Sequence, residues 1–67
     1  MAEIWAGGEE IAEWPHPQLP KVGDAIEITV DGNDEEADVA RVRDVWNKFG
    51  AKVTRIEVTF PGPVPMA

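Results

Sequence analysis

The chain has 67 residues, a net charge of −7 and no cysteine. A chain of this length forms one domain that buries only about 60% of its unfolded surface, so its stability is marginal. The lack of Cys and the single His exclude disulfides and the usual zinc sites, and no apolar run reaches the roughly 18 residues that span a membrane.

The first element is expected to be a β-hairpin over residues 3–14, because two consecutive glycines suit a two-residue turn between two apolar segments. This register places Ile4 opposite Ile11. The alternative is a short helix from Glu9 to Trp14, which would gather its apolar side chains on one face.

The next segment, Trp14–Pro20, holds three of the six prolines and is predicted to be an extended connection. A turn at Gly23-Asp24 then leads into a strand over residues 25–30. There, Ile and Val alternate with Ala, Glu and Thr, which is the period of a half-buried strand. An acidic loop follows at residues 31–36.

Residues 37–49 fit two structures. As a helix over 36–49, the segment repeats apolar side chains at Val39, Val42, Trp46 and Phe49, and periodicity alone favours this interpretation. As a strand, the segment needs a β-bulge, because Val39 and Val42 are three residues apart and would otherwise face opposite sides.

The clearest strand is predicted over residues 52–60, where Ile56 and Val58 share one face. A stiff Pro-rich tail follows at 61–67. We therefore expect one β-rich domain over residues 1–60.

Several of these segments together resemble small Src-homology-like barrel proteins of bacteria and phages. The resemblance covers residues 19–60 and rests on a Pro-x-Val-Gly-Asp turn, a Val-x-x-Val strand that ends near an aromatic residue, and an alternating last strand. These motifs are Leu19–Ile26, Val39–Val42, Trp46 and Arg55–Val58. The resemblance implies a mainly β fold, a small barrel of four to five strands. The alternative fold is α+β, in the order ββαβ with the helix at 36–49. Since small barrels host many functions, the resemblance implies no activity.

Charge is distributed unevenly. Residues 1–40 hold eleven acidic residues and one basic residue, whereas residues 41–67 hold five basic and two acidic ones. This excess of negative charge argues against direct nucleic-acid binding and suits a protein partner with a basic surface. Arg41, Arg43, Lys52 and Arg55 could instead form a basic stripe on paired strands.

No catalytic set is visible, because the chain has no Ser and no Cys to act as a nucleophile with His16. The acidic loop departs from a calcium-binding loop at its sixth and twelfth positions, so neither a metal nor a cofactor is expected. The sequence therefore predicts a non-enzymatic protein-interaction module, with a phage or prophage accessory component as the expected setting. The alternative is an acidic nucleic-acid-mimicking inhibitor that occupies a basic site on a partner protein.

The predicted partner site consists of Trp5, Trp14, His16 and Pro17, since Trp is enriched at binding hot spots and Pro-rich backbone is already ordered. Trp46 is expected in the core. The N-terminus has no signal-peptide pattern, so a cytoplasmic location is expected, or a virion-associated one for a phage protein. Homo-oligomerisation is left open.

Overall fold

A computed structural model describes residues 2–61 and shows five strands and no helix within that range. The strands are β1 (Ala2–Ala6), β2 (Glu9–Trp14), β3 (Ala25–Val30), β4 (Asn33–Trp46) and β5 (Lys52–Thr59). They form one sheet in the order β2-β1-β5-β4-β3. The predicted mainly β fold of four to five strands is confirmed, and the expected tail at 61–67 lies, after Pro61, outside the described residues.

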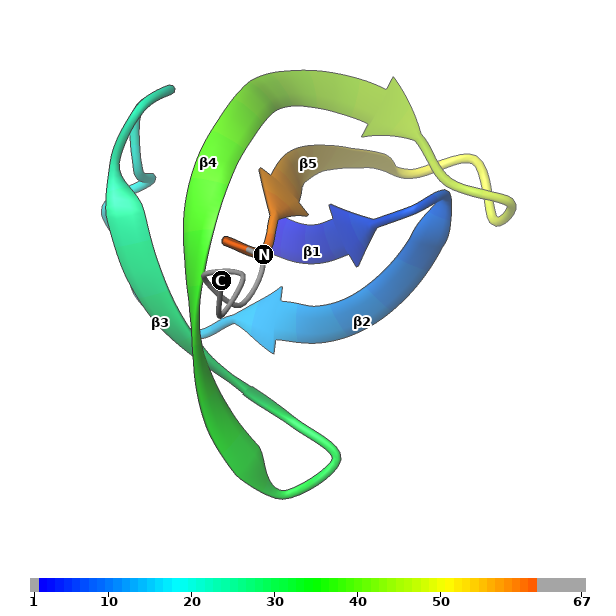
Figure 1. Cartoon of the computed structure of the whole chain (residues 1–67). Coiled ribbons are helices and arrows are strands. Elements are labelled where there is room, and N and C mark those ends of the chain that lie inside the picture. The colour runs from blue at the N-terminus through cyan, green and yellow to red at the C-terminus, as the bar shows by residue number, and fades with distance from the viewer. Residues whose placement is uncertain (1, 62–67) are drawn as a thin grey trace, which may run out of the picture.

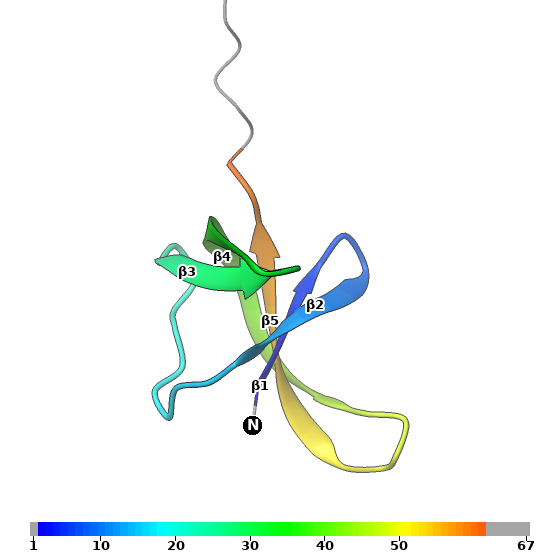
Figure 2. The same cartoon turned by 90° about the horizontal axis from the view of Figure 1, so that it is seen from below.

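The sheet curls into a half-barrel, so that its two edge strands, β2 and β3, approach each other (Figures 1 and 2). All neighbouring strands are antiparallel except β1 and β5, which run in parallel. This parallel pair joins the beginning of the chain to its last strand and so links two hairpins that are far apart in the sequence.

The longest strand, β4, lies where the alternative fold placed a helix, so the helix at 36–49 is wrong. The register of β4 against β5 shifts between Val39 and Arg41, which makes Ala40 the extra residue of a β-bulge. As a result, Val39 and Val42 both face the core although they are three residues apart. Because of the bulge, two inward-facing side chains of a strand are three residues apart, which is also the spacing on one face of an amphipathic helix.

The core fills the inner face of the curled sheet. Eight apolar side chains are buried there: Ala2, Ile4, Ile26, Ile28, Ala37, Val39, Ile56 and Val58. The strands predicted at 25–30 and 52–60 are thus confirmed, together with their inward-facing side chains. Among residues 2–61 no polar or charged residue is buried, so this small core depends on apolar packing.

The first hairpin also exists, and the alternative helix from Glu9 to Trp14 is wrong. Its Gly7-Gly8 turn has positive φ at both residues, as a tight turn between strands requires. The predicted register is wrong by one residue, because Ile4 pairs with Ala12 rather than Ile11. The cause is a second bulge, where the register shifts between Ile4 and Trp5.

The connection from β2 to β3 is irregular, and it bends at residues 16–18 rather than running extended as predicted; it is attached to the sheet at Gly23 and Asp24. The Gly23 N–H donates to the Val39 carbonyl at 2.9 Å, and the Val39 N–H donates to the Asp24 carbonyl at 2.9 Å. The predicted turn is confirmed by the Asp24 N–H, which donates to the Lys21 carbonyl at 3.0 Å. These bonds fix the approach of the chain to β3. No helix that could cross a membrane occurs in residues 2–61.

Candidate protein-binding site

The outer face of the sheet carries a stacked pair formed by Trp5 of β1 and Arg55 of β5. The guanidinium carbon of Arg55 lies 3.8 Å from the centroid of the Trp5 ring. The Trp5 indole N–H donates to Glu3 Oε1 at 3.0 Å, which fixes the plane of the ring. Because both strands turn Ile4 and Ile56 inward, their alternation places these two side chains outward. A guanidinium over an indole face is a favourable cation–π contact.

A second arginine lies directly beside this pair, since Arg43 of β4 is the cross-strand partner of Arg55. Arg43 Nε is 3.0 Å from Glu57 Oε2, so the two side chains form an ion pair. This contact does not have the geometry of a hydrogen bond, so the buried Glu57 Oε2 accepts no hydrogen bond. Arg55 Nε is also buried without an acceptor. Of the two guanidinium groups, Arg43 thus has an ion-pair partner and Arg55 has none among residues 2–61.

Two hollows flank the Trp5–Arg55 stack, and both residues line each of them. The first has a volume of about 450 Å³ and is also lined by Arg43 and by the Gly7-Gly8 turn. The second has a volume of about 480 Å³ and extends from Glu3 and Glu10 to the tip of the β4–β5 hairpin, which supplies Trp46 and Phe49. Together the hollows form a surface groove with an aromatic and cationic centre.

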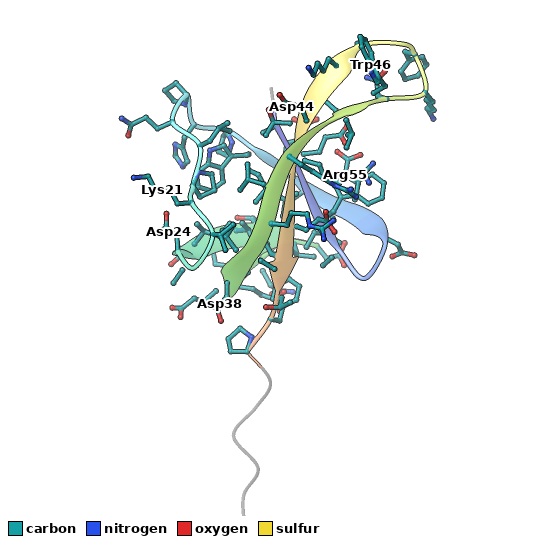
Figure 3. The ribbon with its side chains drawn as sticks, turned by 90° about the horizontal axis from the view of Figure 1, so that it is seen from above. Lys21, Asp24, Asp38, Asp44, Trp46 and Arg55 are labelled. Atoms are coloured by element: carbon teal, nitrogen blue, oxygen red, sulfur yellow. The ribbon has the colours of Figure 1, made fainter. Side chains whose placement is uncertain are left out.

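The β4–β5 hairpin presents the largest exposed aromatic side chains of the described residues. It projects beyond the rest of the sheet (Figure 2), and Figure 3 shows Trp46 at its end. Trp46 is 70% exposed and Phe49 is 82% exposed, so the expectation of a core Trp46 is wrong.

The tip of this hairpin has an ordered geometry. Asn47 Oδ1 accepts hydrogen bonds from the backbone N–H groups of Phe49 and Ala51, each at 2.9 Å. Lys48 Nζ lies 5.2 Å from the Phe49 ring centroid, within the range of a cation–π contact. Phe49 is therefore exposed on a turn whose backbone is held by hydrogen bonds.

The four predicted site residues divide between the two faces of the sheet. Trp5 faces outward, whereas Trp14 pairs with the inward-facing Ala2 and packs against the core. The Trp14 indole N–H donates to the Gln18 carbonyl at 2.8 Å, and its ring meets the His16 ring edge-on at 5.0 Å. His16 and the exposed Pro17 thus lie in the connection beside Trp14, the last residue of β2.

The basic stripe forms in part. Arg41, Arg43 and Arg55 share the outer face, because Arg41 pairs with the outward-facing Glu57 and Arg43 pairs with Arg55. Lys52 lies four residues before the inward-facing Ile56, on the same side of β5, so it does not belong to the outer face. Arg55 projects from the side of the molecule opposite Lys21 (Figure 3).

Sequence reasoning missed Trp46 and Phe49 as candidate binding residues, because helical spacing assigned them to an apolar face. The available signal was the sequence Asn47-Lys48-Phe49-Gly50, which suits a hairpin loop once residues 37–46 are a strand. In such a loop an aromatic side chain has no core to enter. Gly50 has a φ of 80°, as the end of this tight loop requires.

No group of three or more His, Cys, Asp or Glu side chains that could hold a metal ion occurs within residues 2–61. Comparison of the chain with family models, curated proteins and solved structures finds no match. The resemblance to small Src-homology-like barrels therefore stays a prediction, and the functional argument rests on the residues of this chain.

Proposed function

We propose that this protein is a non-enzymatic protein-interaction module that binds its partner in the groove around Trp5 and Arg55. The observation that carries the proposal is the exposure of Trp46 and Phe49, which line the same hollow as Trp5. Aromatic and arginine side chains dominate binding energy at protein interfaces. A small interface can therefore obtain its apolar anchor and its polar contacts from this one face.

The sequence-based site around Trp14 stays a second prediction for the same function. Its exposed members, His16 and Pro17, lie on a bent connection that is held to Trp14 by the Gln18 hydrogen bond. The Trp14 side chain itself is half-buried. We favour the Trp5 groove, because its aromatic side chains offer more accessible apolar area.

Site-specific photo-crosslinking in the native cell tests this proposal. Benzoylphenylalanine replaces Phe49 in one variant and, as the control, Val22 in another, because Val22 is 65% exposed and lies on the connection instead of the groove. We expect one defined protein adduct from position 49 and none from position 22. Equal adducts from both positions, no adduct at position 49, or an adduct only with a second copy of this chain would overturn the proposal.

A second candidate function is the acidic inhibitor that mimics nucleic acid, and the outer face of the β3–β4 hairpin favours it. Glu27 and Glu36 are directly opposite each other there, and Asp34 and Asp38 occupy further outward positions of β4. Like charges placed opposite each other destabilise a sheet, so an acidic face of this kind has a cost in stability.

Salt distinguishes the two candidate functions. A charge-based inhibitor loses affinity steeply as salt rises, because exposed charges are screened beyond about 10 Å at 0.1 M salt. Binding through the aromatic groove changes less over the same range, since its apolar contacts are not screened. The salt dependence of the affinity for the crosslinked partner decides between them.

A further inference from the structure

The groove holds two adjacent arginines but a single ion pair among residues 2–61. Arg43 and Arg55 are direct cross-strand partners, and two like charges in this position repel each other. In the part of the chain that the structure describes, the one salt bridge joins Arg43 to Glu57, and Arg55 forms none. Glu3, the neighbour of Arg55 on β1, directs its Oε1 to the Trp5 indole instead. Arg55 therefore has no ion-pair partner among residues 2–61, although Glu3 is its neighbour on β1.

We infer that Arg55 and Arg43 bind an Asp or Glu side chain within an extended segment of the partner, while apolar side chains on either side of it enter the two hollows. This inference rests on the proposed function and specifies the ligand chemistry. A guanidinium group donates two parallel hydrogen bonds to a carboxylate, and such charge-assisted pairs are stronger than neutral ones. The Trp5 ring holds the Arg55 guanidinium in place, so little side-chain entropy is lost on binding.

The surrounding charges favour a single carboxylate over a nucleic-acid backbone. Glu57 touches Arg43, and Glu3 and Glu10 line the second hollow. These carboxylates, with the net charge of −7, repel a row of phosphates. One carboxylate can reach Arg55 between them, and apolar neighbours on the same peptide suit the aromatic walls.

The arrangement of the hollows favours an internal segment over a chain end. Trp5 and Arg55 line both hollows, so the stacked pair forms a divide that a bound peptide must cross. A peptide that continues in both directions can fill both hollows with its carboxylate at the divide. A terminal carboxylate at the same position would leave one hollow empty.

Selection from random peptide libraries tests the inference directly, because the selected peptides themselves reveal which side chains the groove prefers. One library displays short random peptides between fixed flanking segments, and a second presents them with a free C-terminus. We expect the internal library to yield peptides with an Asp or Glu at one position and apolar side chains on both sides. Enrichment only from the free C-terminal library, enrichment without a fixed acidic position, or no enrichment would overturn the inference.

Substitutions then connect the selected peptide to the groove. We expect Arg55→Gln to weaken binding about tenfold or more, since hydrogen bonds between charged groups are among the strongest in proteins. Arg43→Gln should weaken it as well, and this second variant keeps the test valid if the loss of the Trp5 stack unfolds Arg55→Gln. Arg41→Gln is the matched control, because Arg41 lies on the outer face but lines neither hollow.

Equal losses from Arg41→Gln and Arg55→Gln would show a general charge effect and overturn the inference. Competition with inorganic phosphate provides a further check. If phosphate displaces the peptide at submillimolar concentrations, the site is a phosphate site and the inference is wrong. This inference can fail while the proposed function stands: peptides that depend on Phe49 but carry no acidic residue would support the groove as a binding site and rule out the carboxylate.

Discussion

Ile4 and Ile56 lie side by side across the parallel pair of β1 and β5, and neither side chain has any exposed surface. β2 is an edge strand that is bonded only to β1, so the whole first hairpin is attached to the remaining sheet through β5. The contact between these two isoleucines therefore stabilises the junction between the two ends of the described chain. It also supports Trp5 and Arg55, each of which directly follows or precedes one of them in the sequence.

Ile56→Ala is expected to destabilise the protein by about 2–5 kcal/mol, because it removes buried methyl groups and leaves a cavity in a tightly packed core. A domain of this size has only about 5 kcal/mol of stability, so the variant could be largely unfolded. Urea denaturation followed by Trp fluorescence measures the loss. Val22→Ala, at a site that is 65% exposed, is the control and should change stability by less than about 0.5 kcal/mol.

Gly32→Ala is expected to destabilise the β3–β4 hairpin by about 1–2 kcal/mol, the cost of a left-handed conformation for an L-residue. Gly32 has a φ of 81°, and it forms a two-residue turn with Asp31, whose φ is 52°. A Cβ at Gly32 would touch nothing within 4 Å, so backbone strain is the only cost.

A synthetic chain with D-alanine at position 32 is the matched control for this substitution. The D-residue adds the same methyl group but favours positive φ, so its stability should equal or exceed that of the native chain. Thermal unfolding by circular dichroism compares the three proteins. An equal loss from L-alanine and D-alanine would show that the methyl group itself, rather than the turn geometry, causes the effect.

Local pattern was sufficient to predict β3 and β5. Both strands alternate apolar and polar side chains without interruption, and the buried positions Ile26, Ile28, Ile56 and Val58 follow directly from that alternation. In such strands the alternation alone determines which side chains face the core. The first hairpin was predictable from its two glycines, but nothing in the local pattern indicates the bulge that leaves Ile11 without a partner on β1.

The fourth strand shows why pattern fails where a bulge occurs. The extra residue, Ala40, changes the spacing of inward-facing side chains from two to three, and that spacing also fits a helix. Trp46 is exposed for a separate reason, because β4 continues past the core and its last side chains lie beyond it. The outer site was predicted only in separate pieces, Trp5 and the arginines of the basic stripe, since it joins residues from strands that only tertiary structure brings together.

Glu27→Lys is expected to stabilise the protein by about 0.2–1 kcal/mol, because it replaces a like-charged cross-strand pair with an oppositely charged one. Glu27 and Glu36 are direct partners on the outer face of β3 and β4, and both are exposed. Thermal unfolding should show a higher Tm at low salt, and the gain should shrink as salt screens the pair.

Glu27→Gln separates the removal of repulsion from the gain of attraction and should give an intermediate Tm. Arg41→Lys keeps the net charge and tests for an unspecific effect of substitution at an exposed strand position of the same face. A stability gain of Glu27→Lys that is independent of salt would contradict an electrostatic origin. A loss of stability would show that another contact of Glu27 matters more than its repulsion from Glu36.

Trp14→Phe is expected to lower stability slightly while leaving partner binding intact. The substitution keeps an aromatic ring against the core but removes the indole N–H that donates to the Gln18 carbonyl at 2.8 Å. A single hydrogen bond contributes about 0.5–1.5 kcal/mol, and this exposed one should lie at the lower end, because water can replace the donor. Denaturation measures the loss.

Crosslinking from position 49, repeated in the Trp14→Phe background, then separates the two halves of the predicted partner site. If the partner binds in the Trp5 groove, the adduct persists, because Trp14 lies on the other face of the sheet. The His16→Ala variant, which removes the ring that meets Trp14 edge-on at 5.0 Å, should behave in the same way. Loss of the adduct in either variant, with the fold intact, would instead place the partner on the connection around Trp14, His16 and Pro17.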